Sequence, residues 1–332
     1  MAAAEKFLVL GSNSFSGASF ADYLLEQGCE VLGVSRSPEP DAAFLPYRWS
    51  GRERNFRFFQ FDLNADLDAI VDLAARERPE YFVNFAAQSM VAESWRNPEH
   101  WFTTNVVSTV RLHERLRQLP FLRKYVHVTT PEVYGSTSGF IDENAPFNPS
   151  TPYAVSRAAG DMSLRTYFAN YGFPVVFTRA ANVFGPGQQL YRIIPRTILF
   201  IKLGRKLQLH GGGLSERSFI HIRDVADATL RVARDGRAGD TFHISTPRIV
   251  SIRRLVEMIC ERLGARVDDC VEIAGERPGK DLAYRLDSAK IRRELGWADR
   301  ISLEQGLDET TEWVNRHFDR LKSLPFDYIH KP

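Results

Sequence analysis

The stretch that decides the fold is LVLGSNSFSG, at Leu8–Gly17. It begins as an apolar run typical of a buried strand and turns at its first glycine. The pattern that follows, with Phe20 and Leu24 four residues apart, is typical of one apolar face of a helix over residues 18–27. Gly28 stands where a C-terminal helix cap belongs. The chain is therefore predicted to begin as a strand, a tight turn and a helix.

The same alternation of apolar runs and helical patterns continues through the first half of the chain. Strands are predicted at residues 7–10, 31–34, 56–61, 81–85, 125–129 and 175–178, and further helices at 67–77, 98–119 and 152–171. Strands that are apolar throughout, separated by helices, predict a parallel sheet covered on both faces. The fold class is therefore α/β, with a doubly wound parallel sheet.

The pattern changes after about residue 180. Loops rich in Gly, Pro and Arg, at residues 185–187, 211–213 and 277–279, alternate with shorter elements. This change in composition predicts a first domain over 1–180 and a smaller, mainly substrate-binding lobe over 181–332. We expect the chain to cross between the two lobes more than once.

Composition excludes several classes of protein. The net charge of +2 over 332 residues gives no general attraction to nucleic acid. No apolar run approaches the roughly 20 residues that cross a bilayer, and the beginning of the chain does not resemble a signal peptide. The three cysteines have no metal-ligand spacing, and their odd number favours reduced thiols. We therefore expect a cytoplasmic protein without a metal, a membrane segment or a nucleic-acid partner.

The glycine-rich turn suits a ligand that carries a pyrophosphate. Gly11 and Gly17 let the backbone approach the phosphates, whose charge is favoured by the free N–H groups at a helix start. Ser14 replaces the usual middle glycine and is expected to crowd this approach. At the end of the second strand, Arg36 favours a 2′-phosphate and hence NADP, although Glu39 or Asp41 would suit the ribose of NAD.

Four further motifs occur in a characteristic order: NFAAQS at 84–89, TTPEVYG at 129–135, YAVSR at 153–157 and NVFGPG at 182–187. With them the chain resembles the extended short-chain dehydrogenases/reductases, and among these the nucleotide-sugar 4,6-dehydratases that act on dTDP-glucose or GDP-mannose. The resemblance implies a Rossmann domain, a tightly bound and recycled nicotinamide cofactor, and a homodimer paired through the helices at 98–119 and 152–171.

The resemblance also implies catalytic roles. Tyr153 would take the proton of the sugar 4-hydroxyl while hydride leaves C4, and Thr130 would hydrogen-bond that hydroxyl. Glu132 would then remove the C5 proton as the C6 hydroxyl leaves, before hydride returns to C6. The sequence departs from the family pattern at Arg157, where Lys is usual, and at Pro131, where the dTDP-glucose enzymes have Asp. GDP-mannose enzymes also lack that Asp, so one carboxyl is expected to serve both steps.

The remaining predicted contacts follow from the same motifs. Cofactor contacts are expected at Gly11, Asn13, Ser14, Phe15, Ser16, Gly17, Arg36, Asp62, Leu63, Ala86, Ala87, Gln88, Asn105, Thr129, Tyr153 and Arg157. Contacts to the nucleotide-diphosphate sugar are expected at Ser89, Asn182, Arg192, Arg217 and Arg277. Arginines suit a diphosphate because their planar donors pair with its oxygens.

Two other interpretations stay open. A 4-epimerase, a decarboxylase or a 4-dehydrogenase on the same fold would also begin with oxidation at C4. An epimerase needs no C5 base, so Glu132 argues against it, whereas decarboxylases also carry Glu at this place. The departures at Ser14, Pro131 and Arg157 also suit a cofactor-binding protein whose catalysis is impaired.

Overall fold

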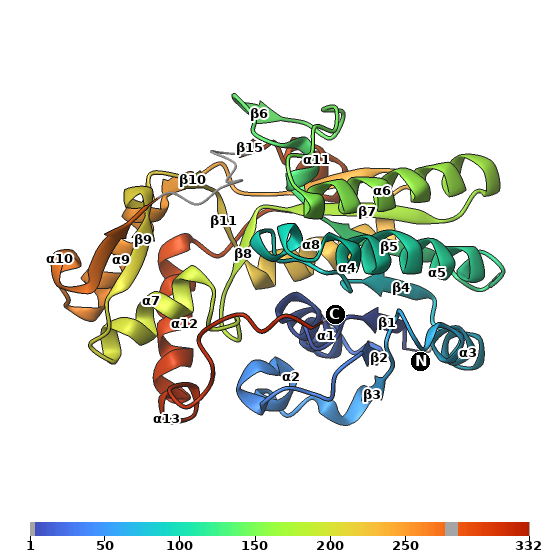
Figure 1. The fold of residues 1–332 in the computed structure, drawn as a ribbon. Coiled ribbons are helices and arrows are strands. Elements are labelled where there is room, and N and C mark those ends of the chain that lie inside the picture. Colours follow the sequence, from blue (N-terminus) through green and yellow to red (C-terminus); the bar gives the residue numbers. More distant parts are fainter. Residues whose placement is uncertain (1–3, 276–284, 332) are drawn as a thin grey trace.

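The structure is a computed structural model that describes residues 4–275 and 285–331. Its centre is a seven-stranded parallel sheet in the order β3-β2-β1-β4-β5-β7-β12 (Figure 1). The strands are β1 (Lys6–Leu10), β2 (Glu30–Ser35), β3 (Phe56–Gln60), β4 (Tyr81–Asn84), β5 (Lys124–Thr129), β7 (Val175–Ala180) and β12 (Thr241–Ile244). The strand order reverses between β1 and β4, which is where a doubly wound sheet offers a crevice to a ligand. The predicted fold class is confirmed.

Helices cover both faces of the sheet, because alternate strand residues point to opposite sides. They are α1 (Phe15–Glu26), α3 (Leu67–Glu77), α5 (Thr109–Leu116), α6 (Pro152–Tyr171) and α8 (Ile222–Asp235). Phe7 and Val9 of β1 belong to one apolar cluster with α1 and α8. Leu8 and Leu10 belong to a second cluster with α3, α5 and α6. The two clusters form the core that fixes the crevice.

The helix predicted over 98–119 is wrong as a single regular helix. The segment consists of α4 (Pro98–Phe102), a π-helical turn (Thr103–Ser108) and α5, which ends at Leu116. The π-helical turn lies against α6, where a Cβ atom at Gly160 would be 2.7 Å from the Asn105 carbonyl oxygen. The wider turn therefore brings the Asn105 backbone close to α6, a placement that helical periodicity does not reveal.

The second lobe is built around three helices, α7 (Ile193–Lys202), α9 (Ile252–Leu263) and α12 (Leu303–Arg316), whose buried side chains form one apolar cluster. The shorter elements are α2 (Pro46–Trp49), β6 (Phe140–Ile141), β8 (Asn182–Phe184), β9 (Leu207–His210), β10 (Glu216–Arg217), β11 (Phe219–His221), β13 (Val250–Ser251), α10 (Val267–Cys270), β14 (Val271–Ala274), β15 (Arg285–Leu286), α11 (Ala289–Leu295) and α13 (Phe318–Leu321). β12 and α8 lie in the first lobe although they follow residue 180, so the second half of the chain supplies both lobes.

Within the described ranges, no helix is long and apolar enough to cross a membrane. The same residues hold no group of His, Cys, Asp or Glu side chains arranged to bind a metal ion. Cys29 and Cys260 are buried free thiols, and Cys270 is half-buried.

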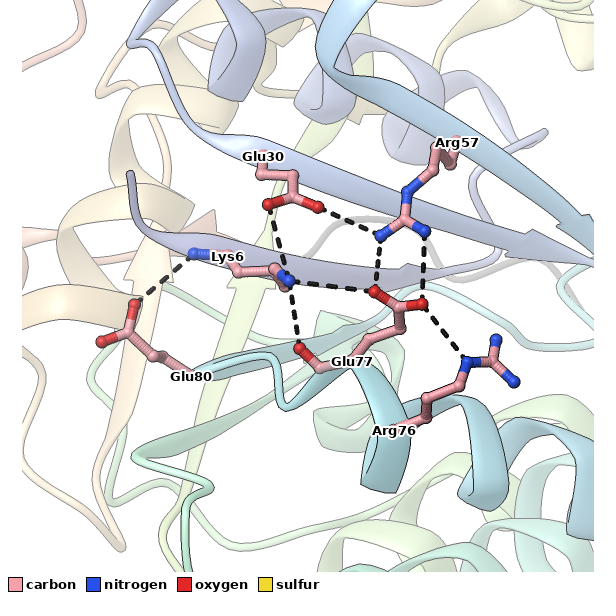
Figure 2. Close-up of polar contacts among 6 residues, drawn as sticks. All are labelled: Lys6, Glu30, Arg57, Arg76, Glu77 and Glu80. Carbon is pink, nitrogen blue, oxygen red and sulfur yellow. Dashed lines mark hydrogen bonds and ion pairs between the residues drawn. The ribbon is translucent and has the colours of Figure 1, made fainter. Parts of the chain in front are cut away.

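An ion-pair network fastens the amino end of the sheet, opposite the crevice (Figure 2). Glu77, at the end of α3, accepts two hydrogen bonds from Arg57 of β3, at 2.6 and 3.2 Å. Lys6 of β1 lies 3.8 Å from the Glu77 carboxylate and 3.5 Å from that of Glu30 in β2. Hydrogen bonding to Arg57 lowers the pKa of Glu77 from 4.5 to about 2. The network therefore joins three strands and a helix.

We expect Glu77→Gln to lower the free energy of unfolding by about 1 kcal/mol at pH 7, because the partner arginine is half exposed and solvent screens the pair. The folded-state pKa lies below the unfolded one, so this contribution is complete above about pH 4.5 and is lost as pH falls towards 2. Urea unfolding of the wild type and the variant, at pH 7 and pH 3, measures it.

The matched control for this prediction is Glu80→Gln. The Glu80 carboxylate accepts one long bond of 3.4 Å from the Lys6 backbone and lies 3.7 Å from Arg123. Its replacement should therefore cost less than that of Glu77. Equal losses in the two variants would remove the special role of Glu77.

Candidate active site

The turn between β1 and α1 is shaped by its two glycines. Gly11 has a φ of 86°, and a Cβ atom there would lie 2.7 Å from the Ala86 nitrogen. A Cβ atom at Gly17 would lie 2.2 Å from the Gly11 carbonyl oxygen. The hydroxyl of Ser14 donates to that carbonyl at 2.7 Å and accepts from the Gly17 N–H at 3.0 Å. Ser14 is thus the N-terminal cap of α1, and its hydroxyl turns back onto the loop's own backbone.

The end of β2 is joined to this turn by Asn13. The Asn13 amide nitrogen donates to the carbonyl oxygens of Ser37 and Pro38, at 2.8 and 3.0 Å. Glu39 and Asp41 are engaged elsewhere: Glu39 accepts from Tyr47 and Arg48, and Asp41 caps the turn at 42–44 and pairs with Arg320. Both carboxylates therefore already have structural partners.

Asn105 holds the loop that follows β4. Its side-chain oxygen accepts from the Gln88 N–H at 2.9 Å, and its nitrogen donates to the Gln88 carbonyl at 3.0 Å and to the Ser156 hydroxyl at 2.9 Å. The side chain is 3% exposed. The π-helical turn thus places Asn105 beneath the loop, where it fixes the backbone of Gln88 against α6.

A cleft of about 1420 Å³ opens beside the carboxyl ends of the strands and reaches into the second lobe. Many of the predicted contacts form its walls: Ser14, Phe15, Ser16, Ala87, Ser89, Thr129, Thr130, Glu132, Tyr153, Arg157, Asn182, Arg192 and Arg217. Arg277 lies outside the described residues. Residues from both halves of the sequence therefore meet around one cavity.

The proposed catalytic groups meet in this cleft. Tyr153, in the first turn of α6, is 8% exposed, and its phenol lies beside Thr130, the residue that follows β5. Burial raises the pKa of Tyr153 above 10.0, the nearby charge of Glu132 raises it further, and the Arg157 charge opposes both. A phenol, a hydroxyl and a carboxylate thus surround one point beside the dinucleotide turn.

A family model described as GDP-mannose 4,6 dehydratase matches residues 8–310. The chain belongs to this family. The dTDP-D-glucose 4,6-dehydratase of Homo sapiens is 32% identical over 328 residues, which cover 97% of this chain and 93% of the relative. The structure of DesIV, a dTDP-glucose 4,6-dehydratase from Streptomyces venezuelae with NAD and TYD bound, is 31% identical, with a TM-score of 0.85 over 95% of this chain and 98% of that one.

A UDP-glucose 4-epimerase of Thermotoga maritima, solved with UDP-glucose, has the same architecture. It is 26% identical, with a TM-score of 0.85 over 94% of this chain and 99% of that one. Dehydratases and epimerases therefore share this fold, and the groups inside the cleft must distinguish them.

In this member of the GDP-mannose 4,6 dehydratase family, both departures from the usual pattern have a structural place. Pro131 is the first residue of the short helical turn Pro131–Tyr134, where its missing N–H removes no bond. Thr130 caps the same turn by accepting from the Glu132 N–H at 3.3 Å. Arg157 is 4% exposed and donates to the Val128 carbonyl oxygen. Its guanidinium is thus held on β5, beside the phenol.

A buried charged cluster that the sequence analysis missed lies behind the catalytic groups of this family member. Asp161, one helical turn after Arg157, accepts from Arg179 at 2.7 Å and from the Thr129 hydroxyl at 3.0 Å. Asp161 and Arg179 are both 0% exposed. One signal was present in the sequence: Arg179 lies in the apolar run of β7, and a charged side chain buried there requires a partner. The pair holds Thr129, the last residue of β5, next to Thr130.

The predicted substrate contacts reach the cleft from separate elements of the second lobe. Asn182 begins β8, Arg192 is the residue before α7, and Arg217 ends β10. The Arg192 guanidinium lies over the Tyr191 ring, 5.3 Å from its centre. Three polar side chains from separate elements thus line one cavity of about 1420 Å³.

Proposed function

We propose that this chain is a nucleotide-sugar 4,6-dehydratase, which converts an NDP-hexose into an NDP-4-keto-6-deoxyhexose. The observation that carries the proposal is the meeting of Thr130, Glu132 and Tyr153 in one cleft beside the glycine-rich turn. Oxidation at C4 needs one group that handles a proton, and elimination across C5 and C6 needs a second. The phenol and the carboxylate meet these two needs.

A nicotinamide dinucleotide fits the turn after β1. The close approaches around Gly11 and Gly17 leave no room for side chains, and the N–H groups at the start of α1 favour phosphate. Ser14, Phe15 and Ser16 would hold the pyrophosphate, and Ala87 and Arg157 would lie near the nicotinamide end. When bound, the cofactor accepts a hydride from sugar C4 and returns one to C6. The sequence favours NADP through Arg36, whereas DesIV was solved with NAD, so we propose the dinucleotide without that preference.

Tyr153 and Thr130 would act in the first half of the reaction. Thr130 contacts the phenol and would orient the sugar 4-hydroxyl towards it, and Tyr153 would take the hydroxyl proton. Burial opposes ionisation of the phenol, and the nearby positive charge of Arg157 favours it. Arg157 therefore takes over the electrostatic part of the role of a lysine, without passing on a proton itself.

Glu132 would act in the second half. Its carboxylate would remove the C5 proton once C4 is a ketone, and the same carboxyl would then protonate the departing C6 hydroxyl. Pro131 has no proton to give, so it does not share this task. Ser89, Asn182, Arg192 and Arg217 would bind the sugar and its diphosphate.

The function is tested by mass spectrometry and NMR of the products formed from dTDP-glucose, UDP-glucose and GDP-mannose in deuterated water. We expect at least one substrate to lose one water and to give a 4-keto-6-deoxy sugar that carries deuterium at C5. A product inverted at C4 with its C6 hydroxyl intact would instead assign a 4-epimerase. Binding without any product would assign a cofactor-binding protein.

We also propose a homodimer paired through α4–α5 and α6. Large apolar side chains are exposed on both helical segments: Phe102 and Val107 on the first, and Val155, Met162, Phe168 and Tyr171 on the second. Exposed apolar side chains gathered on two neighbouring helices suit an interface between subunits. The cytoplasmic location stays a prediction.

A further inference from the structure

The segment after α13 crosses from the second lobe to the first (Figure 1). It forms neither helix nor strand, and its side chains alternate in exposure. Leu324, Phe326, Tyr328 and His330 are half-buried, and Pro325, Asp327, Ile329 and Lys331 are exposed. A period of two is that of an extended chain lying with one face on a surface. We call residues 325–331 the C-terminal strap.

Aromatic contacts hold the strap along its length. The Phe326 ring lies 5.8 Å from that of Phe200 in α7, and the Tyr328 ring lies 5.4 Å from that of Tyr191. His330 then stacks on Trp101 of α4, with ring centres 5.1 Å apart and planes 12° apart. The strap is therefore fastened to both lobes.

His330 makes a second contact with α4. Its Nε2 atom lies 2.8 Å from the Nδ1 atom of His100, and the two rings are stacked with centres 5.1 Å apart. A hydrogen bond and two ring contacts thus fix this residue, whereas the neighbouring Ile329 side chain is 64% exposed.

Beyond His330 the strap enters the crevice of the sheet. The Lys331 carbonyl oxygen accepts from the Gln88 side chain at 2.7 Å and from the Arg36 guanidinium at 3.1 Å. The Lys331 ammonium donates to the Ser37 hydroxyl at 3.0 Å. Gln88 follows β4 and Arg36 follows β2, so the carbonyl lies above the end of β1, which is between them in the sheet. In a doubly wound sheet a dinucleotide binds across this place, with the ribose of its adenosine half at the end of β2, where Arg36 lies.

The large cleft opens on the other half of the groove. Its walls include Ser14, Ala87 and Thr129. Among the described residues, the predicted cofactor contacts Asn13, Arg36, Asp62, Leu63 and Gln88 do not line it. Gln88 is only 3% exposed and Leu63 only 5%. The open cavity thus serves the pyrophosphate and nicotinamide side, while the strap lies at the adenosine end.

We propose that the strap is an internal occupant of the adenosine end, and that a bound dinucleotide displaces its Lys331 end. The proposal rests on the dinucleotide site of the proposed function. The donors of Arg36 and Gln88 now meet the Lys331 carbonyl, and ribose or phosphate oxygens need the same positions. The strap and the adenosine half therefore compete, and the apparent dissociation constant equals the intrinsic one divided by the fraction of molecules whose groove is open.

The test measures ADP-ribose, NAD and nicotinamide mononucleotide binding by calorimetry to the wild type, His330→Ala and Ile329→Ala. His330→Ala removes the stacking and the hydrogen bond to α4 but leaves every groove residue in place. We expect it to lower the dissociation constants of ADP-ribose and NAD about two- to tenfold, as the loss of an aromatic contact predicts. Ile329→Ala should bind like the wild type, and nicotinamide mononucleotide should bind equally to all three.

A second variant lacks residues 328–332 and keeps Phe326, which packs in the second lobe. It should bind ADP-ribose more tightly than His330→Ala does. Hydrogen–deuterium exchange of the wild type should become faster at residues 328–331 when ADP-ribose is added.

Unchanged or weaker binding of ADP-ribose by both strap variants would overturn the proposal, as would slower exchange of the strap. If the wild type meanwhile binds NAD and forms product, only the strap proposal fails. If no variant binds any of the three ligands, the dinucleotide site itself is refuted, and the strap proposal falls with it.

Discussion

Tyr153→Phe should lower turnover of the nucleotide sugar about 10²- to 10⁴-fold, the usual contribution of a positioned general base. The variant keeps the ring that fills the buried site and loses only the hydroxyl that contacts Thr130. Its affinity for the dinucleotide should therefore stay near that of the wild type. Steady-state kinetics together with calorimetric binding of NAD separates the two effects.

The matched control is Tyr81→Phe. Tyr81 is 1% exposed, and its hydroxyl donates to Glu5 at 3.2 Å, near the amino end of β4. This variant also loses one hydrogen bond of a buried tyrosine, but far from the cleft. It should lose stability and keep turnover. Equal turnover in Tyr153→Phe and the wild type would take Tyr153 out of the mechanism.

Glu132→Gln should stop the second half of the reaction and spare the first. Without a carboxylate at this position, exchange of the C5 proton with deuterated water should fall about 10²- to 10⁴-fold. The 4-keto sugar should then accumulate with its C6 hydroxyl still attached. NMR of the quenched mixture shows both effects at once.

The control for Glu132→Gln is Glu77→Gln, which makes the same chemical change at the amino end of the sheet, away from the cleft. It should lose stability while its rate of C5 exchange remains that of the wild type. Full exchange at C5 in Glu132→Gln would assign the proton transfer to another group and leave Glu132 a part of the cleft wall only.

The sequence predicts best those strands in which nearly every residue is apolar. β1, β2 and β4 are largely apolar runs in a parallel sheet, so their position follows from hydrophobicity. β12 escapes the same reasoning because Thr241 and His243 alternate with apolar residues, although both are buried. Their partners, the Arg165 guanidinium and the Tyr134 hydroxyl, come from distant segments. From the sequence alone, a buried polar residue is predicted to be exposed, because the partner that allows its burial is not known.

In the candidate site, too, some residues can be predicted from the sequence and others cannot. The motif order identifies Thr130, Glu132 and Tyr153, because these residues lie within short segments of fixed spacing. The sequence does not identify Asp161 and Arg179, because their role depends on the ion pair between them, and the two residues are 18 positions apart. The strap shows its alternation of Leu324, Phe326, Tyr328 and His330 in the sequence, but the surface that it meets is set by the tertiary fold.

β12 and α8 belong to the first lobe but come late in the sequence, and this order affects how the chain folds during synthesis. A ribosome must have released residue 244 before the last strand can pair with β7, and α8 must have emerged before it can cover α1. A nascent chain that ends near residue 180 would expose the edge of β7 and an apolar helix face. Such an intermediate is prone to aggregate, so we expect early release by puromycin to yield fragments that bind chaperones.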